Sequence, residues 1–224
     1  MAQKYAVIVA GGAGTRLGGD LPKQFQSLKG RPVLWWSMKA FHDEDPDTKI
    51  VLVLNRDFID TWIDMYMHLP LEERFLHEIA EGGATRTESV KSGIWSIPAS
   101  DEVLVAVHDA ARPLVTVDMI REGWRVAGEH KAAIPAVPVT DSLRHLDADG
   151  STAVDRKDYV AVQTPQVFSA KVLHEAYKVT PEAVFTDDAS AVEAYGVKPV
   201  IFSGSPRNMK VTNPGDIQIA SLFL

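Results

Sequence analysis

The chain has 224 residues, 46% hydrophobic and 24% charged, a balance typical of water-soluble globular domains that excludes a disordered or fibrous chain. Its 23 basic and 30 acidic residues give a net charge of −7, so no basic field is available to hold a nucleic-acid backbone. The absence of cysteine excludes disulfides and thiolate chemistry, and no apolar run reaches membrane-spanning length, so we expect a cytoplasmic protein that binds neither nucleic acid nor membrane.

Short runs rich in Val and Ile alternate with longer segments that have helical spacing. The runs are continuously apolar, as in strands buried on both faces, and cover residues 5–10, 50–55, 103–108, 132–137 and 199–203. The helical segments cover residues 33–41, 58–68, 87–97, 118–130 and 171–179. This alternation predicts an α/β fold, a mostly parallel Rossmann-like sheet with helices on both faces, in a single domain over residues 1–224.

The first predicted strand is followed by a glycine-rich segment that carries basic residues. It reads Gly11-Gly12-Ala13-Gly14-Thr15-Arg16, and Lys23 follows seven residues after Arg16. Glycines leave backbone amides free to face an anion, and Arg and Lys add positive charge, so this turn predicts a phosphate site. A Walker loop is excluded because no Lys follows the second glycine, and a dinucleotide fingerprint is disfavoured because Pro22 interrupts the helix it needs.

Asp109 follows the predicted strand over residues 103–108, and ligands of open α/β sheets bind at the carboxyl ends of strands. A carboxylate at this position suits Mg²⁺, which prefers oxygen ligands and bridges phosphates. The alternative role for this carboxylate is a helix cap or an ion pair with Arg112. His108 is interpreted as a core histidine and is left out of the catalytic set.

Residues 140–163 interrupt the alternation of strand and helix. Two short apolar stretches flank the cluster Asp147-Ala148-Asp149-Gly150, which is typical of a turn. The pattern predicts a protruding β-hairpin arm that stands off the main sheet. A lone two-stranded hairpin is only marginally stable in water, so we expect the arm to pack on a second subunit and to support a homodimer.

The glycine-rich segment is the first of several blocks spread along the chain. The others are Gly82-Gly83-x-x-Arg86-x-x-Ser89-Val90, Val107-His108-Asp109-Ala110-Ala111-Arg112-Pro113, Val154-Asp155-Arg156, Gln163-Thr164-Pro165-Gln166, Thr186-Asp187-Asp188-Ala189-Ser190 and Asn208-Met209-Lys210-Val211-Thr212. Together they resemble the sugar nucleotidyltransferases and, more narrowly, the 2-C-methyl-D-erythritol 4-phosphate cytidylyltransferase family of the non-mevalonate isoprenoid pathway. The resemblance covers nearly the whole chain.

This resemblance implies a reaction and a role for each matched residue. The acceptor phosphate attacks the α-phosphorus of CTP in line, with Mg²⁺ or another divalent cation, and 4-diphosphocytidyl-2-C-methyl-D-erythritol and pyrophosphate are formed. Such a transfer relies on alignment and on cations placed where charge accumulates. The expected catalytic residues are Arg16, Lys23 and Lys210. The residues expected to bind CTP are Ala10, Gly11, Gly12, Gly14, Gly82, Gly83, Arg86, Ser89, Asp109 and Ala110.

The acceptor requires a second cationic pocket, and the resemblance implies that the arm of the neighbouring subunit contributes to it. The residues expected to bind the acceptor are Asp109, Arg112, Thr140, Arg156, Thr164 and Thr186. The planar guanidinium of Arg156 suits a phosphate because it can donate two parallel hydrogen bonds.

Two other functions stay open at this point. One is transfer to ribitol 5-phosphate by a closely related family, which Gly11 fits, although Ala111 and the run over residues 188–191 look more like the erythritol enzymes. The other is a nucleotide-binding regulator without turnover. The regulator is disfavoured because a protein that only binds a nucleotide has no need of cations that stabilise a departing pyrophosphate. The chain has all three such cations, Arg16, Lys23 and Lys210.

Overall fold

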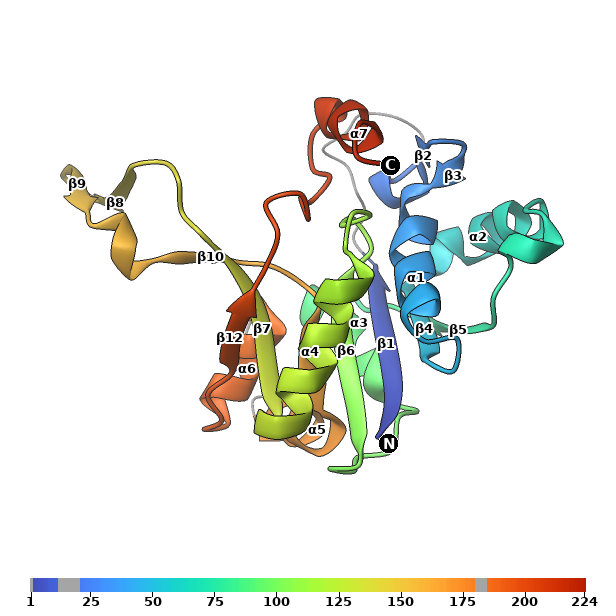
Figure 1. Ribbon diagram of the computed structural model, residues 1–224, viewed down its shortest axis with the longest axis horizontal. Coiled ribbons are helices and arrows are strands. Elements are labelled where there is room, and N and C mark those ends of the chain that lie inside the picture. The colour runs from blue at the N-terminus through green and yellow to red at the C-terminus, as the bar shows by residue number, and fades with distance from the viewer. Residues whose placement is uncertain (1, 12–20, 180–184) are drawn as a thin grey trace.

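The computed structural model describes residues 2–11, 21–179 and 185–224, and within them the chain forms one large mixed sheet. The strand order is β10-β7-β11-β6-β1-β4-β5, and β12 pairs with β7 (Figure 1). The strands of this sheet are β1 (Gln3–Ala10), β4 (Lys49–Leu54), β5 (His77–Glu81), β6 (Val103–Asp109), β7 (Ala132–Pro138), β10 (Val160–Val162), β11 (Gln166–Ser169) and β12 (Val200–Ser203).

The centre of the sheet is parallel, as predicted. β1 pairs in parallel with β4 and β6, β4 with β5, and β12 with β7. β11 runs antiparallel to β6 and β7, and β10 is antiparallel to β7. The sequence pattern missed β5, β10 and β11, because β5 and β10 are largely exposed and only the two middle residues of β11 are apolar.

Helices cover both faces of the sheet, also as predicted (Figure 1). The helices are α1 (Val33–Glu44), α2 (Ile59–Met67), α3 (Arg86–Ile94), α4 (Val117–His130), α5 (Ala170–Val179), α6 (Asp188–Ala194) and α7 (Pro214–Ser221). Alternate residues of β1 divide the core: Ala6 and Ile8 pack in the cluster that contains α1, α2 and α4, whereas Tyr5 and Val7 pack in the cluster with α3, α5 and α6. Among the described helices, none has the length and apolarity needed to cross a membrane.

Several short elements join these layers. They are the 3-10 helices η2 (Lys23–Phe25), η3 (Arg56–Phe58), η4 (Leu71–Glu73) and η5 (Arg156–Asp158), and the small hairpin of β2 (Ser27–Leu28) and β3 (Arg31–Pro32). The hairpin and η2 lie at the same end of the molecule as α7, where Leu28, Val33 and Val211 form a separate small cluster. This end of the fold therefore joins the first and the last parts of the chain.

The predicted arm is present as β8 (Leu143–Asp147) and β9 (Gly150–Val154), and it stands away from the main sheet (Figure 1). The two strands pair antiparallel around the predicted turn, with Asp147 opposite Gly150. Its predicted boundary at residue 163 is wrong, because residues 160–162 form β10, with Val160 opposite Pro138 of β7. The β-branched Val160 and Val162 suit a strand, and they return the chain to the main sheet.

Candidate active site

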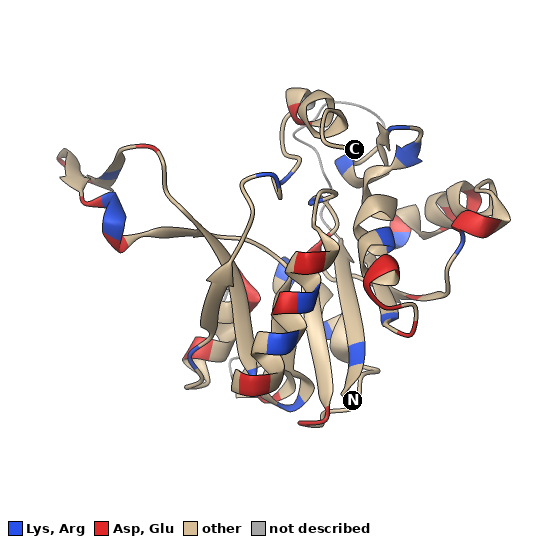
Figure 2. Cartoon of the chain, in the orientation of Figure 1, with Lys and Arg blue, Asp and Glu red and all other residues tan. Residues whose placement is uncertain are grey.

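Three basic side chains converge on the carboxylate of Asp109 at the end of β6. This strand is buried along its whole length and pairs with β1 so that Asp109 lies opposite Val9. Lys210 Nζ lies 2.8 Å from Asp109 Oδ2, Arg112 Nε 3.5 Å from the same oxygen, and Arg86 Nε 3.6 Å from Oδ1. Figure 2 shows basic residues on the loop that joins β12 to α7, close to this end of the sheet. The structure therefore brings together four residues that the sequence assigned to the site.

The electrostatics of this cluster favour an anionic ligand. Burial alone would raise the pKa of Asp109, but Lys210, Arg86 and Arg112 outweigh it and hold the pKa of this carboxyl well below its usual range. Burial lowers the pKa of Arg112, but a guanidinium stays charged at neutral pH. The three cations surround the single carboxylate of Asp109, while Asp188 pairs with Arg86 and Asp187 acts on Arg86 from a greater distance.

Arg86 is the first residue of α3, where a capping box between Thr85 and Glu88 fixes the start of the helix. Its Nη2 donates to Asp188 Oδ2 at 2.6 Å. Burial would lower the pKa of Arg86, but the charge and hydrogen bond of Asp188 outweigh burial and raise it. Asp188 was absent from the residues predicted for the site, because nothing in a linear pattern pairs it with Arg86, 102 positions away.

Lys210 lies in a loop that is tied to the end of β6 on both sides of it. Asn208 is fully buried, its Nδ2 donates to Thr164 O at 2.8 Å, and its carbonyl accepts from Arg112 Nη1 at 2.9 Å. On the other side of Lys210, the Val211 N–H donates to Ala111 O at 2.8 Å. In the sequence, Asn208 is one residue of a matched block, and its buried contacts in the structure show that it helps to place Lys210.

A buried hydrogen-bond chain supports the backbone of Asp109. The Asp109 N–H donates to Thr164 Oγ1 at 3.1 Å, and Thr164 Oγ1 lies 3.1 Å from His108 Nδ1. The Arg112 carbonyl can only accept, so His108 Nε2–H donates to it at 3.2 Å, and in the neutral ring His108 Nδ1 accepts from the Thr164 hydroxyl. His108 is therefore the neutral Nε2–H tautomer, and the hydroxyl of Thr164 is used within the fold. The proposed contact of Thr164 with the acceptor stays a prediction.

The buried His108 makes stability depend on pH. Burial lowers the pKa of His108 from 6.5 to about 4, so the unfolded chain binds this proton first as pH falls. The stability that neutral His108 gives is therefore complete above about pH 6.5, and up to about 3 kcal/mol is lost between pH 6.5 and 4. Denaturant unfolding from pH 4.5 to 7.5 should show a smaller pH slope for His108→Gln than for the wild type. Equal slopes for the two proteins would contradict the assignment.

Gly11 and Gly82, two of the residues predicted to bind CTP, meet around Ser89 beside the end of β1. A Cβ on Gly11 would lie 2.6 Å from Ser89 Oγ, and one on Gly82 would lie 3.0 Å from the same atom. A Cβ on Gly83 would lie 2.2 Å from Glu88 Cβ. A side chain at residue 83 would clash with α3, and one at residue 11 or 82 would displace the Ser89 hydroxyl. The structure thus gathers this part of the predicted CTP set, and the role in binding stays a prediction.

The remaining residues predicted for the first strand and its loop are described only in part. Ala10 O accepts from Gln24 Nε2 at 2.8 Å, which places η2 beside the end of β1. Lys23 is the first residue of η2. The pKa of Asp216 in α7 is lowered mainly by hydrogen bonds from the backbone N–H groups of residues 213 and 212, and the charge of Lys23 lowers it further by a smaller amount. Gly12, Gly14 and Arg16 lie outside the described residues.

Ala110, the last of the predicted CTP contacts, is buried directly after Asp109. Its N–H donates to Val9 O at 3.1 Å, and its carbonyl accepts from Ser37 Oγ at 3.1 Å. These two hydrogen bonds fix Ala110 between the end of β1 and helix α1.

Thr140 and Arg156 are exposed on the arm, and Arg156 donates to the carbonyl of Thr140. The structure does not bring this pair to the Asp109 cluster within one protomer, because the arm stands off the sheet (Figure 1). Thr186 is exposed and precedes Asp187, the N-cap of α6.

The donor set does not fit a metal ion held by the protein alone. Asp109 offers a carboxylate, but both of its oxygens already face cations. Across the described residues, no group of three or more His, Cys, Asp or Glu side chains is arranged to hold a metal. The predicted binding of Mg²⁺ by Asp109 therefore requires further ligands from the nucleotide.

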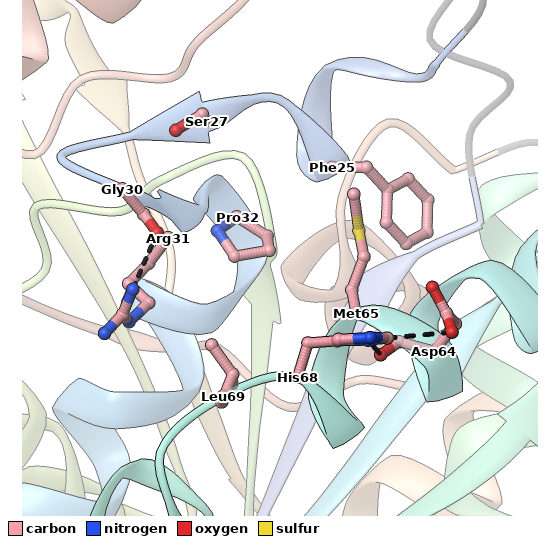
Figure 3. Close-up of a pocket in the computed structure, with 9 residues that line it drawn as sticks. All are labelled: Phe25, Ser27, Gly30, Arg31, Pro32, Asp64, Met65, His68 and Leu69. Carbon is pink, nitrogen blue, oxygen red and sulfur yellow. Dashed lines mark hydrogen bonds and ion pairs between the residues drawn. The ribbon is translucent and has the colours of Figure 1, made fainter.

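A groove of about 480 Å³ lies on another part of the surface, between the end of α2 and the β2–β3 hairpin (Figure 3). Phe25, Met65 and Leu69 line it together with charged side chains. Arg31 is paired there with Glu73, and His68 contacts its helix neighbour Asp64. No residue predicted for the site lines this groove, so it is distinct from the Asp109 cluster.

Comparison with known proteins identifies similar chains over the full length. The family model for IspD, 2-C-methyl-D-erythritol 4-phosphate cytidylyltransferase, matches residues 5–224. The 2-C-methyl-D-erythritol 4-phosphate cytidylyltransferase of Bacteroides thetaiotaomicron is 45% identical, over 99% of this chain and 100% of that protein. The crystal structure of the corresponding Francisella tularensis protein superposes with a TM-score of 0.81 at 27% identity and covers 100% of both chains. The Thermus thermophilus structure has a TM-score of 0.76 at 29% identity and covers 99% of this chain and 98% of that one.

Proposed function

Because this chain belongs to the 2-C-methyl-D-erythritol 4-phosphate cytidylyltransferase family, we propose that the Asp109 cluster is where it transfers the cytidylyl group of CTP to 2-C-methyl-D-erythritol 4-phosphate. The products are 4-diphosphocytidyl-2-C-methyl-D-erythritol and pyrophosphate. The observation that supports this placement is the convergence of Lys210, Arg112 and Arg86 on one carboxylate at the carboxyl ends of β6 and β1. Both substrates are phosphate anions, and three cations meet at this site.

In the proposed reaction, an oxygen of the acceptor phosphate attacks the α-phosphorus of CTP, and the bond from that phosphorus to pyrophosphate breaks. The attacking phosphate is already an anion, so no strong base is needed. His108 agrees with this, because it is buried, neutral and bonded on both ring nitrogens. The protein contributes alignment and positive charge at the atoms where charge accumulates.

Lys210 is proposed to neutralise the α-phosphate in the transition state. Its side chain is 41% exposed, so it can exchange the Asp109 carboxylate for a phosphate oxygen without unfolding its loop. Lys23 and Arg16 are proposed to hold the β- and γ-phosphates. Support for Lys23 comes from η2, which Gln24 ties to the end of β1.

The cytosine ring is proposed to lie against Gly11, Gly82 and Gly83. Ser89 Oγ donates to the carbonyl of Thr85 at 2.9 Å, which fixes the start of α3 against this wall. Backbone amides and carbonyls there can distinguish the amino group of cytosine from the keto group of uracil by donor and acceptor placement.

The acceptor is proposed to bind Arg112, Thr164, Thr186 and Asp109 of one subunit, and Thr140 and Arg156 of the other subunit in a homodimer. The exposed arm supports this proposal, because a lone hairpin with Leu146 76% exposed is marginal unless another surface covers it. We also propose that the protein is cytoplasmic.

A shared site predicts complementation between two inactive variants. Arg156→Ala and Lys210→Ala protomers are each expected to be inactive as pure dimers. In a mixed dimer, one site has the Lys210 of its own subunit and the Arg156 of the other, so it is complete. After random exchange of subunits, about a quarter of the wild-type activity should return. No recovery despite exchange, measured by mass spectrometry of differently tagged subunits, would count against the shared site.

Mg²⁺, or another divalent cation, is proposed to enter with the phosphates of CTP. Because Asp109 is the single carboxylate offered and already faces cations, the protein without nucleotide should show no Mg²⁺ binding by calorimetry at millimolar ion. Turnover should stop with EDTA and return with added Mg²⁺. Full turnover in EDTA, or tight Mg²⁺ binding without CTP, would contradict this proposal.

The acceptor is tested by pyrophosphate release from CTP with 2-C-methyl-D-erythritol 4-phosphate and with ribitol 5-phosphate, and from UTP in parallel. Release with CTP and the erythritol phosphate alone is expected. Release with ribitol 5-phosphate alone would support the other acceptor, and nucleotide binding without release would support a regulator.

A further inference from the structure

Asp188 is a buried acid whose partners connect it to the site. It is fully buried in the first turn of α6, and its carboxylate accepts from Arg86 Nη2 and from the hydroxyl of Tyr177. Its backbone N–H donates to Gln166 Oε1 at 3.0 Å, which fixes the start of α6 against β11. Each oxygen of the Asp188 carboxylate therefore has a defined partner.

The contacts of Arg86 are unequal. Arg86 Nη2 lies 2.6 Å from Asp188 Oδ2, within hydrogen-bond distance, whereas Arg86 Nε lies 3.6 Å from Asp109 Oδ1. The first contact is a short charge-assisted hydrogen bond, and the second is only electrostatic attraction. Arg86 is therefore hydrogen-bonded to Asp188 and not to Asp109.

On the premise of the proposed function, we propose that Asp188, supported by Tyr177, is a positioning residue for Arg86. It keeps Arg86 at the edge of the site as a fixed cation, facing the substrate phosphates instead of closing onto Asp109. Lys210 and Arg112 carry no such second carboxylate partner among the described residues, so they can exchange Asp109 for phosphate.

The variant Asp188→Asn tests this role because it keeps the volume of the side chain and removes its charge. If Asp188 acts by position, Arg86 moves toward Asp109 and kcat falls by about 10- to 100-fold, with KM for CTP and the acceptor changed less than threefold. If only the total charge matters, loss of a negative charge should lower KM for the phosphate substrates and leave kcat unchanged. The two explanations therefore predict changes in different constants.

A double-mutant cycle with Arg86→Gln separates positioning from general stability. If Asp188 acts through Arg86, the double variant should have the kcat of Arg86→Gln alone, because the group being positioned is already absent. If Asp188 only supports the fold, the two losses in kcat should multiply. Tyr177→Phe removes one hydrogen bond to Asp188 and should give a smaller loss in kcat that also vanishes in the Arg86→Gln background.

Glu193→Gln is the matched control, since Glu193 lies on the same helix, is exposed and loses the same charge. It should leave kcat unchanged. If Asp188→Asn fails to fold, the cycle with Tyr177→Phe carries the test. Unchanged kcat in the folded variants, or multiplied losses, would overturn the positioning role. An inactive wild type would instead overturn the proposed function, so the two failures can be distinguished.

Discussion

Lys210→Ala is expected to lower kcat by about 100- to 1,000-fold, because loss of one group that stabilises transition-state charge has an effect of that size. Lys210 is the cation closest to Asp109, and its loop is fixed from both sides by Asn208 and Val211. Stability should change little, since Asp109 keeps Arg86 and Arg112 as partners. The measurement is steady-state pyrophosphate release together with the melting temperature.

The control for this variant is Lys131→Ala. Lys131 also pairs with an aspartate, with its Nζ 3.3 Å from Asp101 Oδ1, but it caps the C-terminal end of α4. We expect its kcat to equal that of the wild type. A loss of melting temperature large enough to explain the inactivity of Lys210→Ala would contradict a catalytic role for Lys210.

Asp109→Asn is expected to lower both stability and turnover. The carboxylate has a pKa far below its ordinary value, so at neutral pH it is charged and its ion pairs are complete. Its removal leaves Lys210 and Arg112 without a carboxylate partner, next to Arg86, which keeps Asp188, and a loss of about 3 kcal/mol in the free energy of unfolding is expected. Turnover should fall by about 100-fold because these cations lose their alignment.

Pyrophosphate distinguishes this explanation from simple misfolding. A bound anion replaces the missing carboxylate, so pyrophosphate should raise the melting temperature of Asp109→Asn more than that of the wild type. Asp101→Asn is the control, because Asp101 pairs with two lysines at exposed positions. An Asp109→Asn protein as stable as the wild type without pyrophosphate would contradict the account of the cluster.

The sequence predicts the strands that are buried on both faces, because such strands consist almost entirely of apolar residues. β1, β4, β6 and β7 are nearly continuous apolar runs. β5 and β10 were missed because both are largely exposed, so burial leaves no apolar run in their sequences. A short strand is stabilised by hydrogen bonds to a neighbouring strand that lies far away in the sequence. The local sequence pattern carries no information about that neighbour.

The residue types in the matched blocks predicted which side chains belong to the site. They did not predict which residues those side chains contact. Asp109, Arg112 and Lys210 were assigned together by resemblance, and the structure places them within contact of one another. Asp188 and Asn208 were missed because their importance comes from contacts across 102 and 44 positions of sequence. Such contacts arise only when α6 packs against β11 and the β12–α7 loop packs against the end of β6.

The most direct test of the account is a crystal structure of this protein with CTP. We predict that Lys210 Nζ leaves Asp109 for an oxygen of the α-phosphate, while Lys23 contacts the β- or γ-phosphate and the cytosine lies against Gly82. A triphosphate bound away from the ends of β1 and β6, with Lys210 still paired to Asp109, would contradict it.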